Sequence, residues 1–436
     1  MIKNKILNNK KNYLDSASAV PVLPEALLEF DKVSKEIFAN SSSVHTLGEK
    51  SREHLDQIRK DFARVVRCRK NEMHFVSSST EANNIFIKGV VLKYLNNTNK
   101  EKNVKVPHII TSLCEHSAIL EPIFYLQTLG AEVSFVMPNK IGKIEVENIR
   151  KEIKENTVLV ALSSVNSETG TVQNVREIAR VLENFAKENS QNKLQEKPLL
   201  YIDASQAAEY ESIDVGALLC DGMCFGARKL GGIAGSAALF VKKNIKLETL
   251  IHGGGQEGGI RSGTENIASL SSFLKVLQAS QNKKIKQENI NIVSELRAYA
   301  IEKIEQAIKE NNKIKIELLG DVKIKNRTHI QKFFNIFKKQ ITQKYFENAA
   351  PHILLIHTPN LLGEECLLRL DAKGICVSTA SACSILEGSG SNFLKSMDRE
   401  NDAKETIRVS FSKNNTKKEI DYFVKTLAEI LEKYQK

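Results

Sequence analysis

Reactive side chains follow directly after short apolar runs at several places in this 436-residue chain. Lys229 comes after "CFGAR", Asp203 ends the run "LLYID", and His116 comes after "HIITSLCE". A Ser/Thr cluster at 77–80 follows the run "MHFV". In an open α/β sheet, side chains beyond the carboxyl ends of the strands line one ligand site. The order of these residues therefore predicts a single shared site.

These four kinds of group suit the parts of one ligand. A Ser/Thr cluster at a helix N-terminus suits a phosphate, and a lysine that follows a strand can form a Schiff base. A carboxylate that faces an aromatic nitrogen keeps that nitrogen protonated, and a histidine can stack on a flat ring. Each signal is weak alone, because a single Asp or His more often caps a helix or packs in a core. Together they describe pyridoxal phosphate (PLP).

Competing ligand motifs are not present where they would be needed. No G-x-G-x-x-G opens the first strand–helix unit, and no G-x-x-x-x-G-K-[ST] occurs. The glycine-rich piece "HGGGQEGG" at 252–259 lies far from that unit, and we expect it to be a flexible turn. Cys220 and Cys224 have no second Cys or His pair after them, so we expect no resident metal.

The elements that must position these groups can be read from the apolar pattern. Short Val- and Ile-rich runs with little alternation predict strands that are buried on both faces of a largely parallel sheet. Seven such strands are predicted, at 73–77, 108–112, 132–137, 157–165, 199–203, 222–225 and 236–241.

Helical spacing of apolar residues predicts helices at 51–67, at 289–310 and near the C-terminus. Thr416 and Glu419 have the spacing of a capping box at the start of the last helix. We expect an N-terminal segment (1–16) that packs with the small domain. A large PLP-binding domain (17–268) and a small C-terminal domain (269–436) should follow it.

The composition narrows the class of protein. Hydrophobic residues make up 42% and charged residues 26%, which is typical of a globular protein, and no apolar run is long enough to span a membrane. The net charge is 63 − 52 = +11, but the Lys residues are scattered, so we expect no direct nucleic-acid binding. Seven cysteines are a sparse, odd set, and the N-terminus lacks a signal sequence, so we expect a reducing, cytoplasmic location.

Ten segments along nearly the whole chain carry a resemblance to a known family. They read "YLDSASAVPVLPEAL" from Tyr13, "ANSSSVHTLG" from Ala39, "SSSTEANNIFIKG" from Ser77, "TSLCEHSAIL" from Thr111, "VNSETGTVQ" from Val165, "YIDASQAA" from Tyr201, "FGARKLGGIAG" from Phe225, "IHGGGQEGGIRSGTENI" from Ile251, "VSTASACS" from Val377 and "IRVSFSKNNTKKEID" from Ile407. The sequence resembles NifS/IscS-type cysteine desulfurases, which are PLP enzymes of the class V aminotransferase group. The resemblance implies an α/β protein of fold type I, with a mostly parallel seven-stranded sheet flanked by helices and a smaller α+β C-terminal domain.

The resemblance also implies which residues contact the cofactor ring. Lys229 matches the lysine that forms the Schiff base with PLP, and Asp203 matches the partner of the ring nitrogen. Gln206 matches the donor to the ring hydroxyl. His116 matches the histidine stacked on the ring, which also relays protons.

Further matches concern the phosphate and the substrate. Ser79 and Thr80 match the helix start that binds the phosphate, and Thr264 matches a threonine that reaches the phosphate from the other subunit of a homodimer. Asn166 matches a residue beside the ring and the substrate. Arg408 matches the arginine that binds the substrate carboxylate, a task that suits a bidentate guanidinium.

Two departures from the family pattern stand out. The family has Ser-x-His-Lys at the Schiff-base site, whereas this chain has Gly226 and Arg228 where the Ser and His would stand. Gly226 has no side chain to offer the phosphate, and we expect Arg228 to contact the phosphate in place of the histidine. Ser41 stands where the family has a proline, with no expected chemical effect.

Cys383 matches the family's nucleophilic cysteine, in a Ser/Ala/Gly-rich stretch that predicts a mobile loop at about 377–394. The other six cysteines lie in or beside apolar stretches, and we expect them to be buried. The sequence predicts no resident metal and leaves open a transient iron–sulfur contact at Cys383.

The implied reaction converts L-cysteine to L-alanine, with Lys229, His116 and Cys383 as catalytic residues and the sulfur held as a persulfide on Cys383. The implied acceptor is an iron–sulfur scaffold protein or a sulfur-relay protein for tRNA thiolation. Three alternatives stay open. They are another class V aminotransferase or a selenocysteine lyase, a non-catalytic scaffold that has lost PLP, and a nucleic-acid-binding protein.

Overall fold

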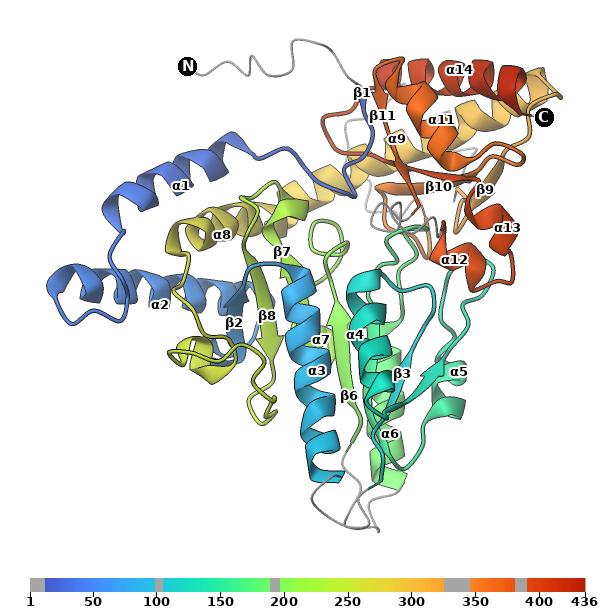
Figure 1. The fold of residues 1–436 in the computed structure, drawn as a ribbon. Helices are drawn as coiled ribbons and strands as arrows, with labels where there is room; N and C mark the ends of the chain where they lie inside the picture. The colour runs from blue at the N-terminus through green and yellow to red at the C-terminus, as the bar shows by residue number, and fades with distance from the viewer. Residues whose placement is uncertain (1–11, 99–104, 189–196, 325–345, 381–389, 436) are drawn as a thin grey trace.

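The computed structural model describes residues 12–98, 105–188, 197–324, 346–380 and 390–435 (Figure 1). Its centre is a seven-stranded sheet in the order β2-β8-β7-β6-β5-β3-β4. Only β8 runs antiparallel to its neighbours, β2 and β7. The strands are β2 (Met73–Val76), β3 (His108–Thr111), β4 (Glu132–Phe135), β5 (Thr157–Ser163), β6 (Leu199–Asp203), β7 (Gly222–Gly226) and β8 (Ala237–Val241). All seven predicted strands are confirmed, with ends within two residues of those expected.

Helices cover both faces of this sheet, which explains the near-continuous apolar runs of its strands. On one face, Phe62 and Phe273 pack edge to face with ring centroids 4.9 Å apart. On the other face, Phe86 stacks on Tyr201 at 4.5 Å. The helices are α1 (Pro24–Glu36), α2 (Thr46–Val66), α3 (Ser79–Thr98), α4 (Ser117–Thr128), α5 (Val146–Glu152), α6 (Val175–Glu188), α7 (Val215–Leu218) and α8 (Ile267–Gln281).

A smaller antiparallel sheet, in the order β12-β13-β10-β9, has its own apolar core. Helix α9 starts at Lys283, six residues before the expected 289, because the Asn282 side chain caps it by accepting from two backbone N–H groups. The predicted capping box of Thr416 and Glu419 is confirmed. The remaining elements are α9 (Lys283–Glu310), β9 (Glu317–Leu319), β10 (Ile353–His357), α11 (Gly363–Asp371), β12 (Ser378–Thr379), α12 (Asn392–Lys395), α13 (Glu400–Ala403), β13 (Thr406–Ser410) and α14 (Lys417–Tyr434).

The N-terminal segment lies against the smaller sheet. Strand β1 (Asn12–Tyr13) pairs in parallel with β11 (Ile375–Cys376), and Asp15 bridges to Ser410. This pairing brings the turn after β1 next to β13, although nearly 400 residues separate the two in the sequence.

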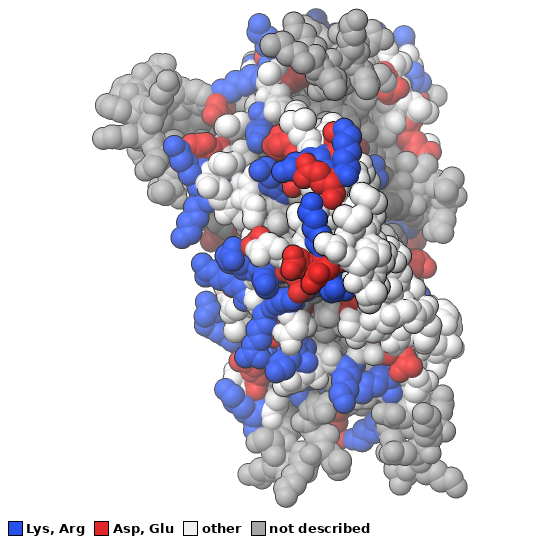
Figure 2. All heavy atoms as spheres, turned by 90° about the vertical axis from the view of Figure 1, so that its left-hand side faces the viewer, with Lys and Arg blue, Asp and Glu red and all other residues white. Residues whose placement is uncertain are grey.

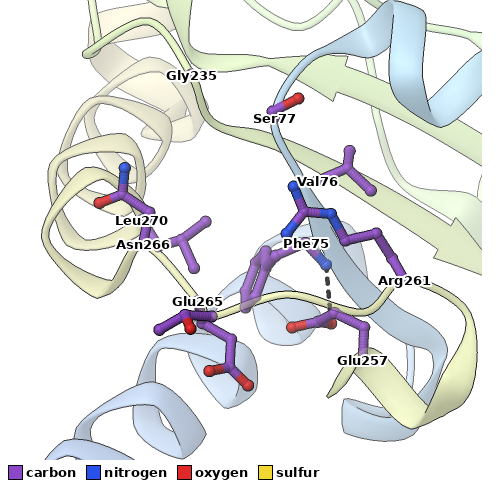
Figure 3. Close-up of a pocket in the computed structure, with 10 residues that line it drawn as sticks. Phe75, Val76, Ser77, Gly235, Glu257, Arg261, Glu265, Asn266 and Leu270 are labelled. Carbon is purple, nitrogen blue, oxygen red and sulfur yellow. Dashed lines mark hydrogen bonds between the residues drawn. The ribbon is translucent and has the colours of Figure 1, made fainter. Parts of the chain in front are cut away.

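The glycine-rich segment at 252–259, which we expected to be a flexible turn, is held in place by a buried ion pair. Glu257 lies in the short 3-10 turn η4 (Gln256–Gly259), and its carboxylate accepts from both terminal nitrogens of Arg59 at 2.6 and 2.8 Å. The same carboxylate accepts from the Phe75 backbone N–H at 2.9 Å (Figure 3). Arg261 adds a second ion pair at 2.7 Å with Glu81 in the first turn of α3. The segment is a turn, as expected, and Glu257 anchors this turn to α2 and β2.

Glu257→Ala should lower the free energy of unfolding by about 3–5 kcal/mol, because Arg59 would keep its charge in a site with little access to solvent. Urea denaturation would measure this loss. The matched control is Glu155→Ala, which breaks an ion pair between exposed side chains with Lys105 and should leave the urea midpoint unchanged. Equal urea midpoints for wild type and Glu257→Ala would show that the ion pair between Glu257 and Arg59 does not stabilise the fold.

Candidate active site

Lys229 lies in the 3-10 turn η3 (Ala227–Leu230), directly after β7. Its Nζ donates to the carbonyl oxygens of Ala17 and Ser18, the latter at 2.9 Å. Burial, followed by the nearby Arg408 charge, lowers the pKa of the Lys229 ammonium to about 8. With this pKa about a tenth of the amine is neutral at pH 7, far more than for an ordinary lysine, and the neutral amine is the form that attacks a carbonyl group.

The lowered pKa of Lys229 predicts how the rate of covalent PLP loading depends on pH. Below pH 8 the neutral fraction changes about tenfold per pH unit, so the loading rate of apo-protein should rise to about pH 8 and then level off. A lysine with an ordinary pKa would instead give a rate that rises to about pH 10. Stopped-flow absorbance of PLP mixed with apo-protein measures the rate, and a plateau near pH 10 would contradict the assignment.

Asp203 ends β6, and its buried carboxylate has a hydrogen-bond donor on each oxygen. Oδ1 accepts from the Ser205 backbone N–H and Oδ2 accepts from Asn83 Nδ2, both at 2.8 Å. A carboxylate held in this way at the sheet edge suits a protonated ring nitrogen, because it offers a fixed negative charge in a site of low dielectric constant.

The start of α3 carries the two residues expected to bind the phosphate, Ser79 and Thr80. The helix begins at Ser79, whose Oγ accepts from Ser205 Oγ at 2.8 Å, and Thr80 in the same first turn is exposed. A Cβ at Gly226 would lie 3.1 Å from Ser79 Oγ, a tight contact, so the glycine lets the end of β7 approach this hydroxyl closely. The hydroxyl groups and the helix N-terminus suit a phosphate group.

Arg228 is exposed in the single chain. Its positive charge contributes to lowering the pKa of the Lys229 ammonium, so the guanidinium lies near the proposed ring site. Its contact with the phosphate stays a prediction.

His116 caps the N-terminus of α4, and its Nδ1 accepts from the Ala118 backbone N–H at 3.0 Å. Burial lowers the pKa of His116, and the charges of Lys229 and Arg408 lower it further, while Asp203 opposes them. The neutral ring therefore carries its proton on Nε2. These mutual influences show that the four side chains share one site.

Arg408 reaches this site from β13 of the smaller sheet. Its terminal nitrogens donate to the Ser167 carbonyl at 2.9 Å, to Ser18 Oγ at 2.6 Å and to Asp15 Oδ1 at 3.2 Å. Its Nε is buried and has no hydrogen-bond partner among the described residues. The guanidinium is thus fixed in place with a spare donor, which suits a carboxylate ligand.

The two predicted amides are engaged with the protein. Asn166 donates to the Cys114 carbonyl at 2.8 Å, and its Oδ1 accepts from the backbone N–H groups of residues 168 and 169, so it braces the turn after β5. Gln206 donates to the Ala17 carbonyl at 2.9 Å and contacts His352 Nε2 at 3.1 Å. Their contacts with PLP stay predictions.

Thr264 and Lys229 do not line a common pocket in the described part of the chain. Thr264 is exposed and lines a pocket of about 220 Å³. Phe75, Ser77 and Glu265 line the same pocket (Figure 3). Cys383 lies outside the described residues. The expectation that the other cysteines are buried is wrong for Cys68 and Cys376, which are partly exposed.

The structure adds residues that the sequence did not single out. Asn83 and Ser205 hold Asp203, whereas Asp15 and Ser18 hold Arg408. All four occur inside the segments that carry the family resemblance. Their presence in those segments was the only available signal, because their partners are distant in the sequence.

Comparisons with known proteins agree with this geometry. The family profile described as Aminotransferase class-V matches residues 12–423. Cysteine desulfurase IscS of Clostridium botulinum is 30% identical, with 97% of this chain and 95% of that protein covered. The chain belongs to the class V aminotransferases, in the NifS/IscS-type cysteine desulfurase family. Cysteine desulfurase IscS of Dictyoglomus turgidum is 28% identical over 97% of this chain and 94% of that protein.

The fold of this cysteine desulfurase family member matches known structures. A solved NifS-like protein is 26% identical and superposes with a TM-score of 0.78, covering 97% of this chain and 99% of that one. The predicted α/β fold of type I is therefore confirmed. Class V aminotransferases of this kind depend on PLP, and the lysine, carboxylate and helix start described above fit that cofactor.

Proposed function

We propose that this enzyme converts L-cysteine to L-alanine and holds the released sulfur as a persulfide on Cys383. The observation that supports this most is the joint arrangement of Lys229, Asp203 and Arg408. Lys229 supplies a partly neutral amine, and Asp203 supplies a carboxylate that is held in place. Arg408 supplies a guanidinium that is also held in place and has an unpaired N–H among the described residues. They suit the reaction of an α-amino acid on PLP.

When it is bound, PLP supplies the electron sink that lets the α-proton of the amino acid leave. Arg408 binds and orients the substrate carboxylate through its guanidinium. Lys229 Nζ takes the α-proton, and its lowered pKa suits a base that works near neutral pH. Asp203, as a carboxylate, would keep the ring nitrogen of PLP protonated.

His116 donates from Nε2, because the helix N-terminus occupies its Nδ1. The Cys383 thiolate attacks the sulfur of the substrate. The carbon–sulfur bond breaks, its electron pair stays on the substrate β-carbon, and that carbon takes up a proton to give alanine. The sum is cysteine plus enzyme thiol giving alanine plus enzyme persulfide.

The test is incubation of the purified holoenzyme with L-cysteine and a thiol reductant, with alanine and sulfide measured together. Equal amounts of both support the proposal. Pyruvate or keto-acid products would favour another class V aminotransferase, and faster turnover of selenocysteine without a need for Cys383 would favour a selenocysteine lyase. Purified protein that binds no PLP would favour a scaffold.

A homodimer is the proposed assembly, with Thr264 entering the partner's site. Four apolar residues of α1 and of the stretch before α2 are exposed in the single chain, and Val44 is 98% exposed. The four are Leu27, Leu28, Phe38 and Val44. Helices α1 and α2 lie on the side of the molecule shown in Figure 2, where a broad uncharged area adjoins Lys and Arg side chains. Sedimentation should give twice the chain mass, and an active monomer would contradict the proposal.

An iron–sulfur scaffold protein or a sulfur-relay protein is the proposed sulfur acceptor, in the cytoplasm. None of the helices among the described residues is long and apolar enough to cross a bilayer. On the face shown in Figure 2, Lys and Arg predominate along one flank, with a few Asp and Glu side chains among them. The division at residues 16 and 268 remains the proposed domain organisation.

A further inference from the structure

A fully buried polar network contacts the Asp203 carboxylate. Asn83 of α3 donates from Nδ2 to Asp203 Oδ2 at 2.8 Å. Its Oδ1 accepts from the Tyr201 hydroxyl at 2.7 Å and from Cys224 Sγ at 3.1 Å. The side chains of Asn83, Tyr201 and Cys224 have no exposed surface. An amide is an expensive group to bury, and here the described contacts satisfy its oxygen and one of its N–H groups.

The orientation of the Asn83 amide follows from its neighbours. Tyr201 and Cys224 are both hydrogen-bond donors that stay protonated, because burial raises the pKa of each well above its ordinary value. Two donors on one side require the amide oxygen there. The NH₂ group must then face Asp203, where the reversed amide would place two acceptors against each other.

We propose that Asn83 is a positioning residue that keeps the proton of the Asp203–cofactor pair on the ring nitrogen of PLP. This inference rests on the proposed function. It adds the residue that keeps the ring nitrogen of PLP protonated. In a site without water, the pair can exist as carboxylate and pyridinium or as neutral carboxylic acid and pyridine, and the two states can be similar in free energy. Donors to the carboxylate stabilise its charged form and so leave the proton on the ring.

The chain supplies two such donors, and they differ in kind. The Ser205 N–H belongs to the backbone, and every residue except proline would supply it. Asn83 donates from its side chain, so a substitution at this position removes the donor. Its amide is oriented from outside the ligand site by Tyr201, whose ring is itself fixed by stacking on Phe86. The network therefore acts on the cofactor without touching it.

The test is Asn83→Leu, which keeps the approximate volume and removes the donor. The holoenzyme is reconstituted with PLP labelled with ¹⁵N in the ring, and the nitrogen resonance reports protonation directly. We expect a protonated nitrogen in wild type and an unprotonated one in the variant. Turnover (kcat) should fall about 10- to 100-fold, with KM for cysteine changed less than about threefold.

The control is Asn84→Leu, the same substitution one residue along α3, where the amide donates only to the Thr80 carbonyl. It should keep the wild-type nitrogen resonance. If Asn83→Leu does not fold, the ¹⁵N resonance of Asn83→Ala is measured instead, and an unprotonated nitrogen is again expected.

A protonated nitrogen in the Asn83 variant would overturn the inference while leaving the proposed function intact. If the wild-type protein takes up no labelled PLP and forms no alanine from cysteine, the proposed function itself has failed.

Discussion

Lys229→Ala should produce alanine from cysteine at least about 10³-fold more slowly than wild type. Lys229 is the proposed covalent anchor of PLP and the proposed base for the α-proton, and the lowered pKa of its ammonium suits both tasks. The measurement is alanine formed by the holoenzyme at saturating cysteine, together with the visible absorption of bound PLP.

Lys286→Ala is the matched control for this prediction. Burial also lowers the pKa of Lys286 to about 8, but its Nζ donates to the Glu211 carbonyl, away from the site. Loss of a buried amine alone should therefore leave turnover unchanged. Full turnover in Lys229→Ala, or equal losses in both variants, would remove Lys229 from the mechanism.

Cys383→Ser should keep PLP and still bind cysteine, but it should lose persulfide formation and sulfur delivery. A serine hydroxyl is neither ionised near neutral pH nor able to hold sulfur in a persulfide, whereas a thiolate does both. Mass spectrometry after cysteine treatment should place one extra sulfur atom on the Cys383 peptide of wild type and none on that of the variant. Sulfur transfer that survives the substitution would contradict the stated mechanism.

Cys68→Ser serves as the control for this second prediction. Cys68 is partly exposed, but burial raises the pKa of its thiol to about 12, so it stays protonated and unreactive. Persulfide formation should be unchanged in this variant. An adduct that maps to Cys68 would show that exposure, and not the local environment of Cys383, selects the nucleophile.

The elements that carry the site could be predicted because they depend on local patterns. Strand β6 reads as an uninterrupted apolar run, since both of its faces are covered by helices, and Asp203 stands where that run must end. The capping box of Thr416 and Glu419 closes within three residues. Such features are decided by short-range sterics and hydrogen bonding, which a single sequence records.

The segment at 252–259 shows what the local pattern does not contain. Its glycines favour a flexible turn, but one carboxylate among them finds Arg59, almost 200 residues earlier, and the pair fixes the segment. The strength of that pair comes from its burial between α2 and β2, and burial is a property of the assembled layers.

The sequence by itself determined which residue types stand at the ends of the strands, and hence that Lys229, Asp203 and His116 share one site. Only the tertiary structure decided how they are held. Asp15 and Ser18 fix Arg408 across 393 and 390 residues, and Asn83 reaches Asp203 across 120. The reason is physical: a buried polar group must find a partner wherever packing places one, and that choice is made when helices and sheets pack together.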